Sequence, residues 1–250
     1  MKADRLTTME QYIISHEKVT IAQLQERFGI SINTLRSDLD VLEKRGTVSK
    51  IYGGAVAQTI ASLTSMPKRF EQNMPIKRRI GELAASLIPD NATVYIDSGS
   101  TTTNIIPYLG ARKGLTIVTN SLPAINEATR LGNLNIVTLG GIYNASVGAF
   151  VGISVFDALR SLSVNIAVMA ATGVSIKSGL SNTTYFEAEI KRLVTANSRE
   201  IILLADHTKF DHEAMISYCP LSKVSTVITD AAPSQDFLDY FESNGIRLIC

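Results

Sequence analysis

From residue 76 to the end of the chain, short apolar runs alternate with segments that have helical spacing. The runs are nearly continuous in apolar residues, which is typical of strands buried on both faces of a sheet. Strands that alternate with helices predict an α/β fold with a parallel sheet. The expected strands are residues 93–97, 115–119, 135–139, 165–170, 200–205, 226–229 and 247–249, and the expected helices are residues 77–88, 101–109, 121–131, 154–162, 185–198 and 234–244.

Residues 1–57 follow a different pattern, of three helices and a β-hairpin. Apolar residues at helical spacing predict the first helix. Thr20 and Gln23 form a capping-box pattern that starts a second helix, and Gly29 allows a sharp turn after it. Ser31 is a favourable N-cap for a third helix.

The third helix has an apolar stripe that must face a small core, and a polar side that stays outside. The stripe consists of Ile32, Leu35, Leu39 and Leu42. Gly46 is expected to end the helix. Residues 47–57 then alternate in polarity, with Gly53 and Gly54 at the expected turn of the hairpin.

Residues 58–75 are rich in Ser, Thr and Ala and contain Pro67 and Pro75. We expect a linker there. It separates an N-terminal domain of residues 1–57, a winged helix-turn-helix, from a C-terminal domain of residues 76–250.

Charge is distributed unevenly along the chain. Residues 1–80 carry 13 Lys and Arg against 8 Asp and Glu, whereas residues 81–250 carry 11 against 15. A basic N-terminal part and an acidic C-terminal part indicate an anionic partner for the N-terminal part. However, random surface charge explains so small an imbalance equally well. The charge therefore supports DNA binding without establishing it.

Composition narrows the class of protein. No stretch approaches the ~18–20 apolar residues of a membrane span, and the first residues lack the apolar core of a secretion signal. Cys219 and Cys250 are the only cysteines and have no metal-ligand spacing. We expect a cytoplasmic protein with no disulfide, metal site or cofactor.

Two short helices joined by a tight turn can place the second helix in the major groove of DNA. On the polar side of the third helix, Arg36 suits guanine and Asn33 suits adenine, and Ser31 suits phosphate. A helical cap or a protein-docking module has the same periodicity, so periodicity alone leaves these readings open. The predicted DNA-binding residues are Thr20, Ser31, Asn33, Thr34, Arg36, Ser37, Lys50, Tyr52 and Gly53.

A second candidate site follows the strand expected at residues 93–97. The sequence there is VYIDSGSTTTNIIPYL, residues 94–109, in which Gly99 allows a close backbone approach. Backbone N–H groups and Ser and Thr hydroxyls at the start of a helix suit a phosphate. A capped βα loop has the same residues, so this motif alone leaves both interpretations open.

Three more motifs follow expected strands, namely TNS at 119–121, LGG at 139–141 and DHTKF at 206–210. Parallel strands place such loops at one edge of the sheet, where open α/β sheets bind ligands. Lys77 and Lys191 are further candidates, although a solvated surface charge explains Lys191 equally well. The predicted effector-binding residues are Lys77, Asp97, Ser98, Gly99, Ser100, Thr101, Thr102, Asn120, Ser121, Gly140, Gly141, Lys191, Asp206 and Lys209.

The string FGISINTLRSDLDVLEKRG followed by SKIYGGA resembles the N-terminal signature of the DeoR family of bacterial regulators. The residues that fit are Ser31, Thr34, Arg36, Asp38, Leu39, Leu42, Gly46, Gly53, Gly54 and Ala55. Three positions depart from the family pattern: Ser37 stands where a second Arg is usual, and Lys50 and Tyr52 replace Arg and His. These departures put the operator sequence in doubt more than DNA binding itself.

The C-terminal motifs resemble the sensor domain of the same family. They are KRRIGELA, DSGSTT, TNS, LGG, EAEIK, DHTKF and ITD, in the family's order, between residues 76 and 230. The resemblance implies a Rossmann-like parallel sheet of the ribose-5-phosphate isomerase and CoA transferase type. It also implies a repressor of carbohydrate genes, acting as a homodimer or homotetramer on double-stranded operator DNA under the control of a phosphorylated sugar or polyol.

Two alternatives differ from a sensing repressor. One is a sugar-phosphate isomerase fused to a DNA-binding head, and isomerisation requires a positioned base. The isomerases carry acidic groups after a central strand, whereas this chain reads AVMAATGVS at 167–175, which leaves Glu187 without an acidic partner. We therefore expect no catalytic residues, on fold analogy. The other alternative is an interaction module without a ligand.

Overall fold

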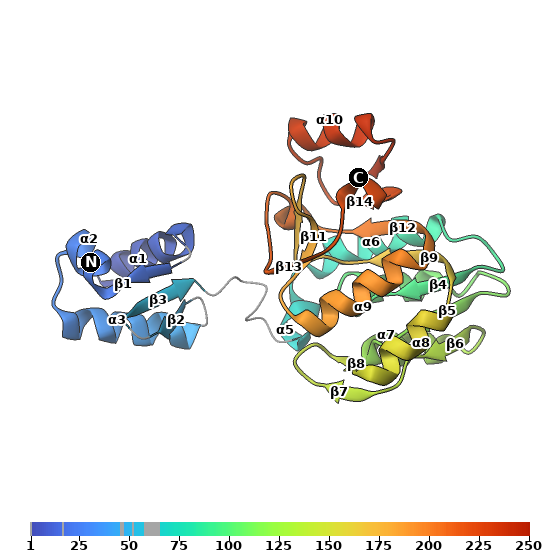
Figure 1. Cartoon of the computed structure of the whole chain (residues 1–250), viewed down its shortest axis with the longest axis horizontal. Helices are drawn as coiled ribbons and strands as arrows, with labels where there is room; N and C mark the ends of the chain where they lie inside the picture. Colours follow the sequence, from blue (N-terminus) through green and yellow to red (C-terminus); the bar gives the residue numbers. More distant parts are fainter. Residues whose placement is uncertain (1, 17, 46–47, 52, 58–65) are drawn as a thin grey trace. The chain divides into compact units, whose positions relative to one another are not determined.

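The computed structural model describes residues 2–16, 18–45, 48–51, 53–57 and 66–250 (Figure 1). The chain divides into two compact units, Met1–Thr64 and Ser65–Cys250, called here the N-terminal and C-terminal units. Each is described by itself.

The N-terminal unit has three helices and a small antiparallel sheet. Its elements are α1 (Lys2–His16), β1 (Lys18–Thr20), α2 (Ile21–Phe28), α3 (Ile32–Arg45), β2 (Val48–Ile51) and β3 (Gly54–Ala57). The strand order is β1-β3-β2, and β2 pairs antiparallel with β3, which confirms the predicted hairpin. Met9, Leu24 and Leu35 are fully buried in one core.

Local sequence signals account for the two helices of the helix-turn-helix. The Thr20 side chain accepts a hydrogen bond from Gln23 N at 3.2 Å while Thr20 N donates to Gln23 Oε1 at 2.8 Å, so the predicted capping box is present. Gly29 has φ 61° and ends α2. Of the predicted apolar stripe of α3, Leu35, Leu39 and Leu42 are buried, but Ile32 is 40% exposed, because it lies at the first residue of the helix.

The C-terminal unit is built on a seven-stranded sheet in the order β15-β14-β12-β9-β4-β5-β6. All its strand pairs are parallel, as predicted. The strands are β4 (Thr93–Ile96), β5 (Thr116–Thr119), β6 (Asn135–Thr138), β9 (Val164–Met169), β12 (Ser198–Leu204), β14 (Thr226–Ile228) and β15 (Arg247–Ile249). The chain winds outward from β4 to β6, returns to β9 beside β4, and winds outward again to β15.

Helices cover both faces of this sheet (Figure 1). One face packs against α6 (Met74–Ser86), the 3₁₀-helix η1 (Thr102–Tyr108) and α7 (Leu122–Leu131). The other packs against α8 (Ile153–Ser161), α9 (Tyr185–Ala196) and α10 (Gln235–Ser243). Burial on both faces explains why the strands are nearly continuous in apolar residues.

Two sequence expectations need correction. Residues 66–71 of the expected linker form a helix, α5 (Met66–Glu71), and α6 already begins at Met74. Pro67 and Pro75 lie at the second residue of each helix, where proline is tolerated because its missing N–H has no intrahelical partner. Residues 58–65 of that linker, with Gly46 and Tyr52, lie outside the described residues.

Within the helix expected at residues 101–109, Thr102–Tyr108 form a 3₁₀-helix rather than an α-helix. Pro107 has no N–H, and the β-branched Thr and Ile residues before it have low helix propensity. The sequence also missed several elements of three or four residues, which are too short for periodicity to detect. They are β7 (Ile142–Asn144), β8 (Ala149–Val151), β10 (Gly173–Ser175), β11 (Gly179–Asn182), β13 (Ile216–Cys219), η2 (His207–Lys209) and η3 (Leu221–Lys223).

Among the described residues, no helix is both long and apolar enough to span a bilayer.

Candidate functional site

The first candidate site is the polar side of α3. Asn33, Arg36 and Ser37 are exposed and Thr34 is half-buried, because Leu35 and its apolar neighbours along the helix face the core. Ser31 Oγ accepts a hydrogen bond from Thr34 N at 3.2 Å, which fixes the start of the helix. The predicted residues of α3 therefore lie together on one accessible side.

An ion pair between the half-exposed Arg5 and the buried Asp38 holds α3 against α1. Arg5 Nε donates to Asp38 Oδ2 at 2.8 Å and Arg5 Nη2 to Asp38 Oδ1 at 3.2 Å, and the Asp38 side chain is 1% exposed. The hydrogen bonds to Asp38 raise the pKa of Arg5. Bidentate pairing of this kind fixes orientation. Asp38 thus positions the helix and does not face outward.

Lys50 on β2 lies against α3. Its Nζ forms ion pairs with Asp40 and with Glu43, the latter at 3.1 Å, and these contacts raise the pKa of Lys50. A DNA contact by Lys50, as predicted, would have to replace these partners. Gly53 has φ 79° in the exposed turn, and Thr20 is exposed at the start of α2.

The second candidate site lies where the winding of the large sheet reverses, between β4 and β9. At this point the connections on the two sides of the sheet run in opposite directions, and open α/β sheets bind ligands at the carboxyl ends of the strands there. Residues 97–101 follow β4 and residues 170–172 follow β9. The fold therefore brings the DSGSTT motif to the position where open α/β sheets bind ligands.

Asp97 fastens the two strand ends together. Its carboxylate accepts hydrogen bonds from Ser98 N at 2.8 Å, Ala170 N at 3.0 Å and Lys191 Nζ at 2.5 Å. Lys191 Nζ also donates to Ala170 O at 2.6 Å and lies 5.3 Å from the centre of the Tyr218 ring. Lys191 is therefore a buried ion-pair partner rather than a solvated surface charge.

The loop after Asp97 is held from inside by two threonines. Thr102 Oγ1 lies 2.7 Å from Asp97 O and 2.9 Å from Gly99 O, and Thr103 Oγ1 donates to Gly99 O at 3.0 Å. A Cβ on Gly99 would lie 2.6 Å from Ala170 Cβ, so only glycine fits. The Thr102 hydroxyl, predicted to bind the effector, donates its proton within the loop instead.

The remaining polar groups of this loop have no partners. Within the described residues, the hydroxyls of Ser98, Ser100 and Thr101 make no hydrogen bond, and the N–H groups of Gly99, Ser100 and Thr101 donate to no group. The three hydroxylated side chains are each 7% exposed. These hydroxyls are not among the fully buried side-chain atoms that lack a partner, so they keep some access to solvent, and the set can donate to an acceptor that the chain itself does not supply.

Three cations, Arg69, Lys77 and Lys209, lie close enough to interact electrostatically in a chain that reaches Asp97 at the start of this loop. Burial lowers the pKa of Lys77 to about 8; Asp206 opposes the shift, whereas Lys209 and Arg69 add to it. Burial also lowers the pKa of Arg69, against the charges of Glu187 and Asp97. These electrostatic interactions connect Lys77 with Arg69, Asp206 and Lys209, and connect Arg69 with Asp97 at the end of β4.

The cations differ in their partners. Lys77 Nζ donates to the backbone oxygen of Arg69. The guanidinium of Arg69 and the ammonium of Lys209 make no hydrogen bond or ion pair with described residues, and Arg69 Nε is buried. Asp206 accepts from Thr208 N at 3.0 Å and caps the turn that carries Lys209. Among the described residues, no cluster of acidic, His or Cys side chains is arranged to hold a metal.

Arg69 was missed as a site residue from sequence. It lies in the segment expected to be a linker, and it enters the sequence analysis only as one of the basic residues in the charge of residues 1–80. Arg69 lies on α5, eight residues before Lys77 on α6. This spacing indicates a shared site only once the positions of the two helices are known.

The fold does not bring every predicted residue to this cluster. Asn120 accepts from Tyr95 Oη at 2.9 Å and donates to Phe150 O at 2.9 Å, so its amide links β4 to β8. Ser121 caps α7 through Ala124 N at 3.3 Å and is fully buried. The hydrogen bonds of both side chains therefore stabilise the fold.

The LGG motif also lies apart. It follows β6, two strands from β4, and no described contact links it to the cations. A Cβ on Gly141 would lie 2.6 Å from Val151 O, so this glycine serves packing rather than room for a ligand. A Cβ on Gly140 would meet nothing within 4 Å.

Two family models match the chain. A DeoR-like helix-turn-helix domain matches residues 5–61, and a DeoR C-terminal sensor domain matches residues 72–231. The two matches correspond to the two structural units and to the two candidate sites.

Curated relatives match along nearly the whole chain. The HTH-type transcriptional regulator IolR of Bacillus subtilis (strain 168) is 35% identical over 99% of both chains. The glycerol-3-phosphate regulon repressor of Escherichia coli (strain K12) is 28% identical over 92% of this chain and 91% of that protein. Among solved structures, ribose 5-phosphate isomerase A of Methanocaldococcus jannaschii aligns with a TM-score of 0.42 and 21% identity over 56% of this chain and 55% of that one. The chain belongs to the DeoR family, and is a transcriptional regulator with a DNA-binding helix-turn-helix domain and a C-terminal sensor domain.

Proposed function

We propose that the chain is a repressor of carbohydrate-metabolism genes that releases its operator when a phosphorylated sugar or polyol binds the C-terminal unit. The observation that carries the proposal is the set of hydroxyls and N–H groups at residues 98–101 that have no partner among the described residues, together with Arg69, which interacts with Asp97, and Lys77, which interacts with Arg69 and Lys209. Backbone N–H groups with adjacent cations suit a phosphoryl group. The names of relatives, including a glycerol-3-phosphate regulon repressor, support an effector of this class.

In the N-terminal unit, α3 enters the major groove. Arg36 and Asn33 contact base edges, and Ser31, Thr34 and Ser37 contact bases or phosphates. Thr20 at the start of α2 and residues 50–53 of the hairpin contact the backbone. Two N-terminal units, supplied by a homodimer or homotetramer, bind half-sites about one helical turn apart.

In the C-terminal unit, the phosphoryl group accepts from Ser98, Ser100 and Thr101, and from N–H groups of the same loop. Arg69, Lys77 and Lys209 balance its charge. Asp97 and Lys191 hold the loop rather than the ligand, and Asp206, at the carboxyl end of β12, adjoins the sugar hydroxyls. Effector and DNA oppose each other, so DNA must weaken effector binding by the same factor by which effector weakens DNA binding.

We propose that the site binds without catalysis. Residues 170–175 after β9 carry no carboxylate, and Asp97 is paired with Lys191. Glu187 accepts a hydrogen bond from Thr184 Oγ1 at 2.6 Å at the start of α9. Aldose–ketose isomerisation needs a base aimed at the substrate. Incubation with pentose phosphates should give no ketose, and ketose formation that Glu187→Gln abolishes would restore the isomerase alternative.

A thermal-shift screen tests the proposal directly. The purified chain is heated with sugar and polyol phosphates, and with the same compounds lacking phosphate. A true effector at 100 times its Kd adds about 2.7 kcal/mol to the unfolding free energy. We expect stabilisation by a phosphorylated compound only, and its loss in Ser98→Ala/Thr101→Val. Equal stabilisation by unphosphorylated compounds, or stabilisation that persists in this variant, would contradict the proposed site.

A further inference from the structure

The C-terminal unit begins with a very short helix. α5 (Met66–Glu71) has six residues and follows the boundary between the two units, which lies between Thr64 and Ser65. Isolated helices of fewer than about 12 residues are marginal in water, so α5 depends on its contacts with the rest of the unit. A change in these contacts therefore changes how much of the chain is held by the C-terminal unit.

Two contacts fasten α5 to its unit. Met66 is 3% exposed, and a Cβ on Gly148, just before β8, would lie 3.3 Å from Met66 Cγ and 3.5 Å from Met66 Cε. Met66 therefore packs directly on the turn between β7 and β8. The second contact is the hydrogen bond that Lys77 Nζ of α6 donates to Arg69 O. One apolar contact and one hydrogen bond thus join α5 to β8 and to α6.

A third group on α5 lacks a partner. Arg69 Nε is buried, and the guanidinium has no hydrogen-bond or ion-pair partner among the described residues. Burial lowers the pKa of Arg69, although the charges of Glu187 and Asp97 oppose that shift. A buried charge without a hydrogen-bonded partner is costly, so it weakens the docking of α5. An anion that accepts from Arg69 would remove this cost and strengthen the docking.

We propose that α5 is the element through which the effector controls DNA binding, because its docking shortens the connection between the two units. The proposal rests on the proposed function, in which Arg69 and Lys77 bind the phosphoryl group. In the free chain α5 detaches part of the time, and residues up to Asn73 then belong to the connection. Bound phosphate holds α5 through both cations.

The length of the connection determines the direction of the response. Each residue that α5 releases adds at most about 3.5 Å to the reach of the N-terminal unit. In the free chain this extra reach lets the N-terminal units of an assembly span their half-sites. Docking of α5 by the effector withdraws that reach, and the operator is released.

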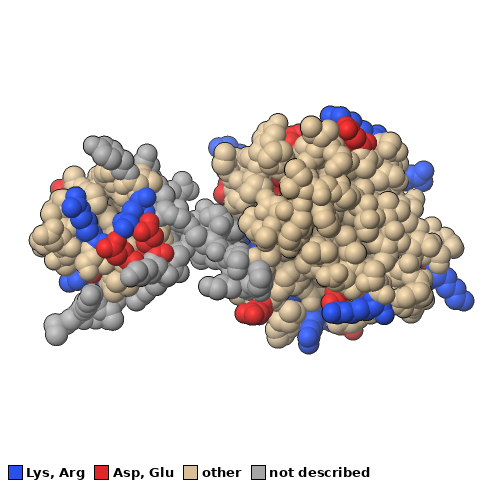
Figure 2. Space-filling view, turned by 90° about the horizontal axis from the view of Figure 1, so that it is seen from below, with Lys and Arg blue, Asp and Glu red and all other residues tan. Residues whose placement is uncertain are grey.

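Trypsin reports the docking of α5 directly. From residue 51 to residue 67 the chain contains no Lys or Arg, so the first trypsin sites after Lys50 are Lys68 and Arg69, both within α5. A helix has to open locally before a protease can cut it, so the rate of cleavage after Lys68 measures how often α5 detaches. Exposed Lys and Arg occur on both units (Figure 2), and the fragments are therefore identified by mass.

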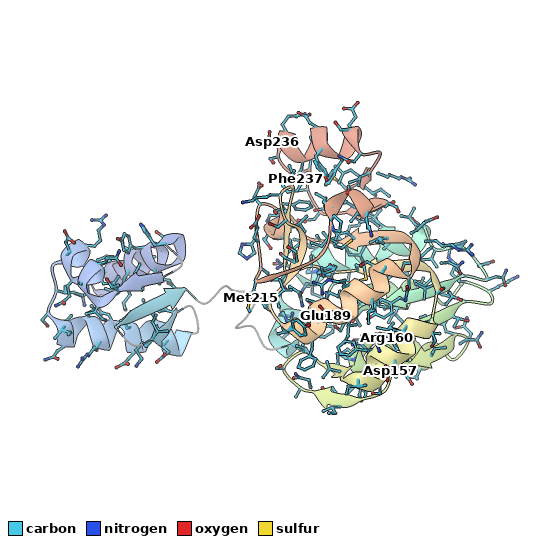
Figure 3. All side chains as sticks on the ribbon, in the orientation of Figure 1. Asp157, Arg160, Glu189, Met215, Asp236 and Phe237 are labelled. Atoms are coloured by element: carbon cyan, nitrogen blue, oxygen red, sulfur yellow. The ribbon has the colours of Figure 1, made fainter. Side chains whose placement is uncertain are left out.

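Inorganic phosphate and glycerol 3-phosphate serve as probes, and a thermal shift establishes whether each binds. We expect a probe that binds to slow cleavage after Lys68 roughly tenfold or more, since it adds a charge-assisted hydrogen bond to α5. Arg69→Gln should lose this protection. The control site is Arg160 on α8, which lies 2.9 Å from Asp157 (Figure 3), and cleavage there should change less than about twofold.

The outcomes separate this proposal from the proposed function. A chain that binds neither probe fails the proposed function, and this proposal fails with it. A probe that binds and leaves cleavage after Lys68 unchanged overturns this proposal alone. Equal slowing after Lys68 and after Arg160 also overturns it, because the probe would then stabilise the whole unit rather than α5.

A longer connection separates reach from binding. About eight Gly and Ser residues inserted between Thr64 and Ser65 form a flexible coil that replaces the length withdrawn by α5. We expect this variant to bind the probe and protect α5 as the wild type does, and to stay on labelled operator DNA at probe concentrations that release the wild type. The same insertion between the exposed Ala231 and Ala232 is the control and should be released normally. Release of the lengthened variant at the wild-type concentration, or its failure to bind the operator, would contradict the proposal.

Discussion

The two units present their functional polar groups in opposite ways. On α3, Asn33, Arg36 and Ser37 project into solvent from a helix that is fixed from behind by Leu35 and Asp38. In the C-terminal unit, the hydroxylated candidate ligands of the effector and Lys77 are almost wholly buried, and Arg69 and Lys209 are partly buried. DNA is a surface, so side chains that protrude can reach it. A small anion has to be enclosed, and its binding groups are therefore withdrawn from water before it arrives.

Within the C-terminal unit the same contrast recurs between two lysines. Lys191 is buried and is paired with Asp97 and Ala170 O, whereas Lys209 is half-buried and has no partner in the part of the chain that the structure describes. A buried charge with its partner stabilises one conformation, and a charge without one is available to a ligand. The account thus predicts that stability and effector affinity depend on different lysines.

Lys191→Met should produce the largest effect on folding. It leaves the Asp97 carboxylate buried without its ammonium partner, which costs about 3–5 kcal/mol of unfolding free energy. Urea unfolding measures the loss, and Lys209→Met is the matched control, with an expected change below about 1 kcal/mol. Equal losses in the two variants would remove the distinction between the lysines.

Arg69→Gln should weaken effector binding without destabilising the fold. The guanidinium has no hydrogen-bond or ion-pair partner among the described residues, and one charge-assisted hydrogen bond contributes about 1.5–3 kcal/mol, or roughly 10- to 150-fold in Kd. Calorimetric titration measures the affinity. Arg79→Gln, on the exposed face of α6 beside Glu82, serves as the control and should bind as the wild type does. Unchanged affinity in Arg69→Gln would exclude this residue from the site.

Arg36→Ala tests the other half of the comparison. An exposed arginine aimed at a base should contribute about 1–3 kcal/mol to operator binding and nothing to effector binding. Gel-shift titration at fixed salt measures the first and a thermal shift the second. The exposed Arg199 of β12 provides a control substitution to Ala. If both variants lose the same affinity, the contribution is general charge and not recognition by α3.

The smallest effect concerns pH. Lys77 has a pKa of about 8, lowered from 10.5 by burial, and a bound phosphate should raise that pKa again. Binding therefore takes up a proton above pH 8, and effector affinity should fall by up to about tenfold per pH unit as pH rises through 8. Lys77→Arg should flatten the profile between pH 7 and pH 9. The opposite slope would place the phosphate away from Lys77.

The same shift has a consequence for stability. Between pH 8 and pH 10.5 the unfolded chain binds more protons at Lys77 than the folded chain does. This residue's contribution to the unfolding free energy therefore rises with pH across that window, which is opposite in direction to its effect on effector affinity.

Sequence patterns predicted the parallel sheet and the helix-turn-helix correctly. Burial of a strand on both faces and capping of a helix each require particular residues within one short segment, so the sequence shows them directly. The β7–β8 hairpin and the 3₁₀ form of residues 102–108 depend on contacts between distant segments, which periodicity does not record. Pro67 shows the limit clearly, since proline is typical both of a linker and of the first turn of a helix.

The candidate site was predicted unevenly for a similar reason. Ser98, Ser100 and Thr101 follow a buried strand, so their place at the sheet edge could be read from sequence. The pairing of Lys191 with Asp97 and the approach of Arg69 could not, because they join residues far apart in the chain. Gly141 was predicted to leave room for the ligand, but it permits close packing against Val151 O. The sequence alone does not distinguish these two reasons for a glycine.

Fluorescence anisotropy of labelled operator DNA tests the central claim most directly. The wild-type chain is titrated onto the operator with and without the phosphorylated sugar or polyol that stabilises it, alongside Arg69→Gln. The account predicts that the effector releases DNA from the wild type at concentrations near its Kd and that the variant needs at least tenfold more. Operator binding that is unaffected by every stabilising phosphate would contradict it.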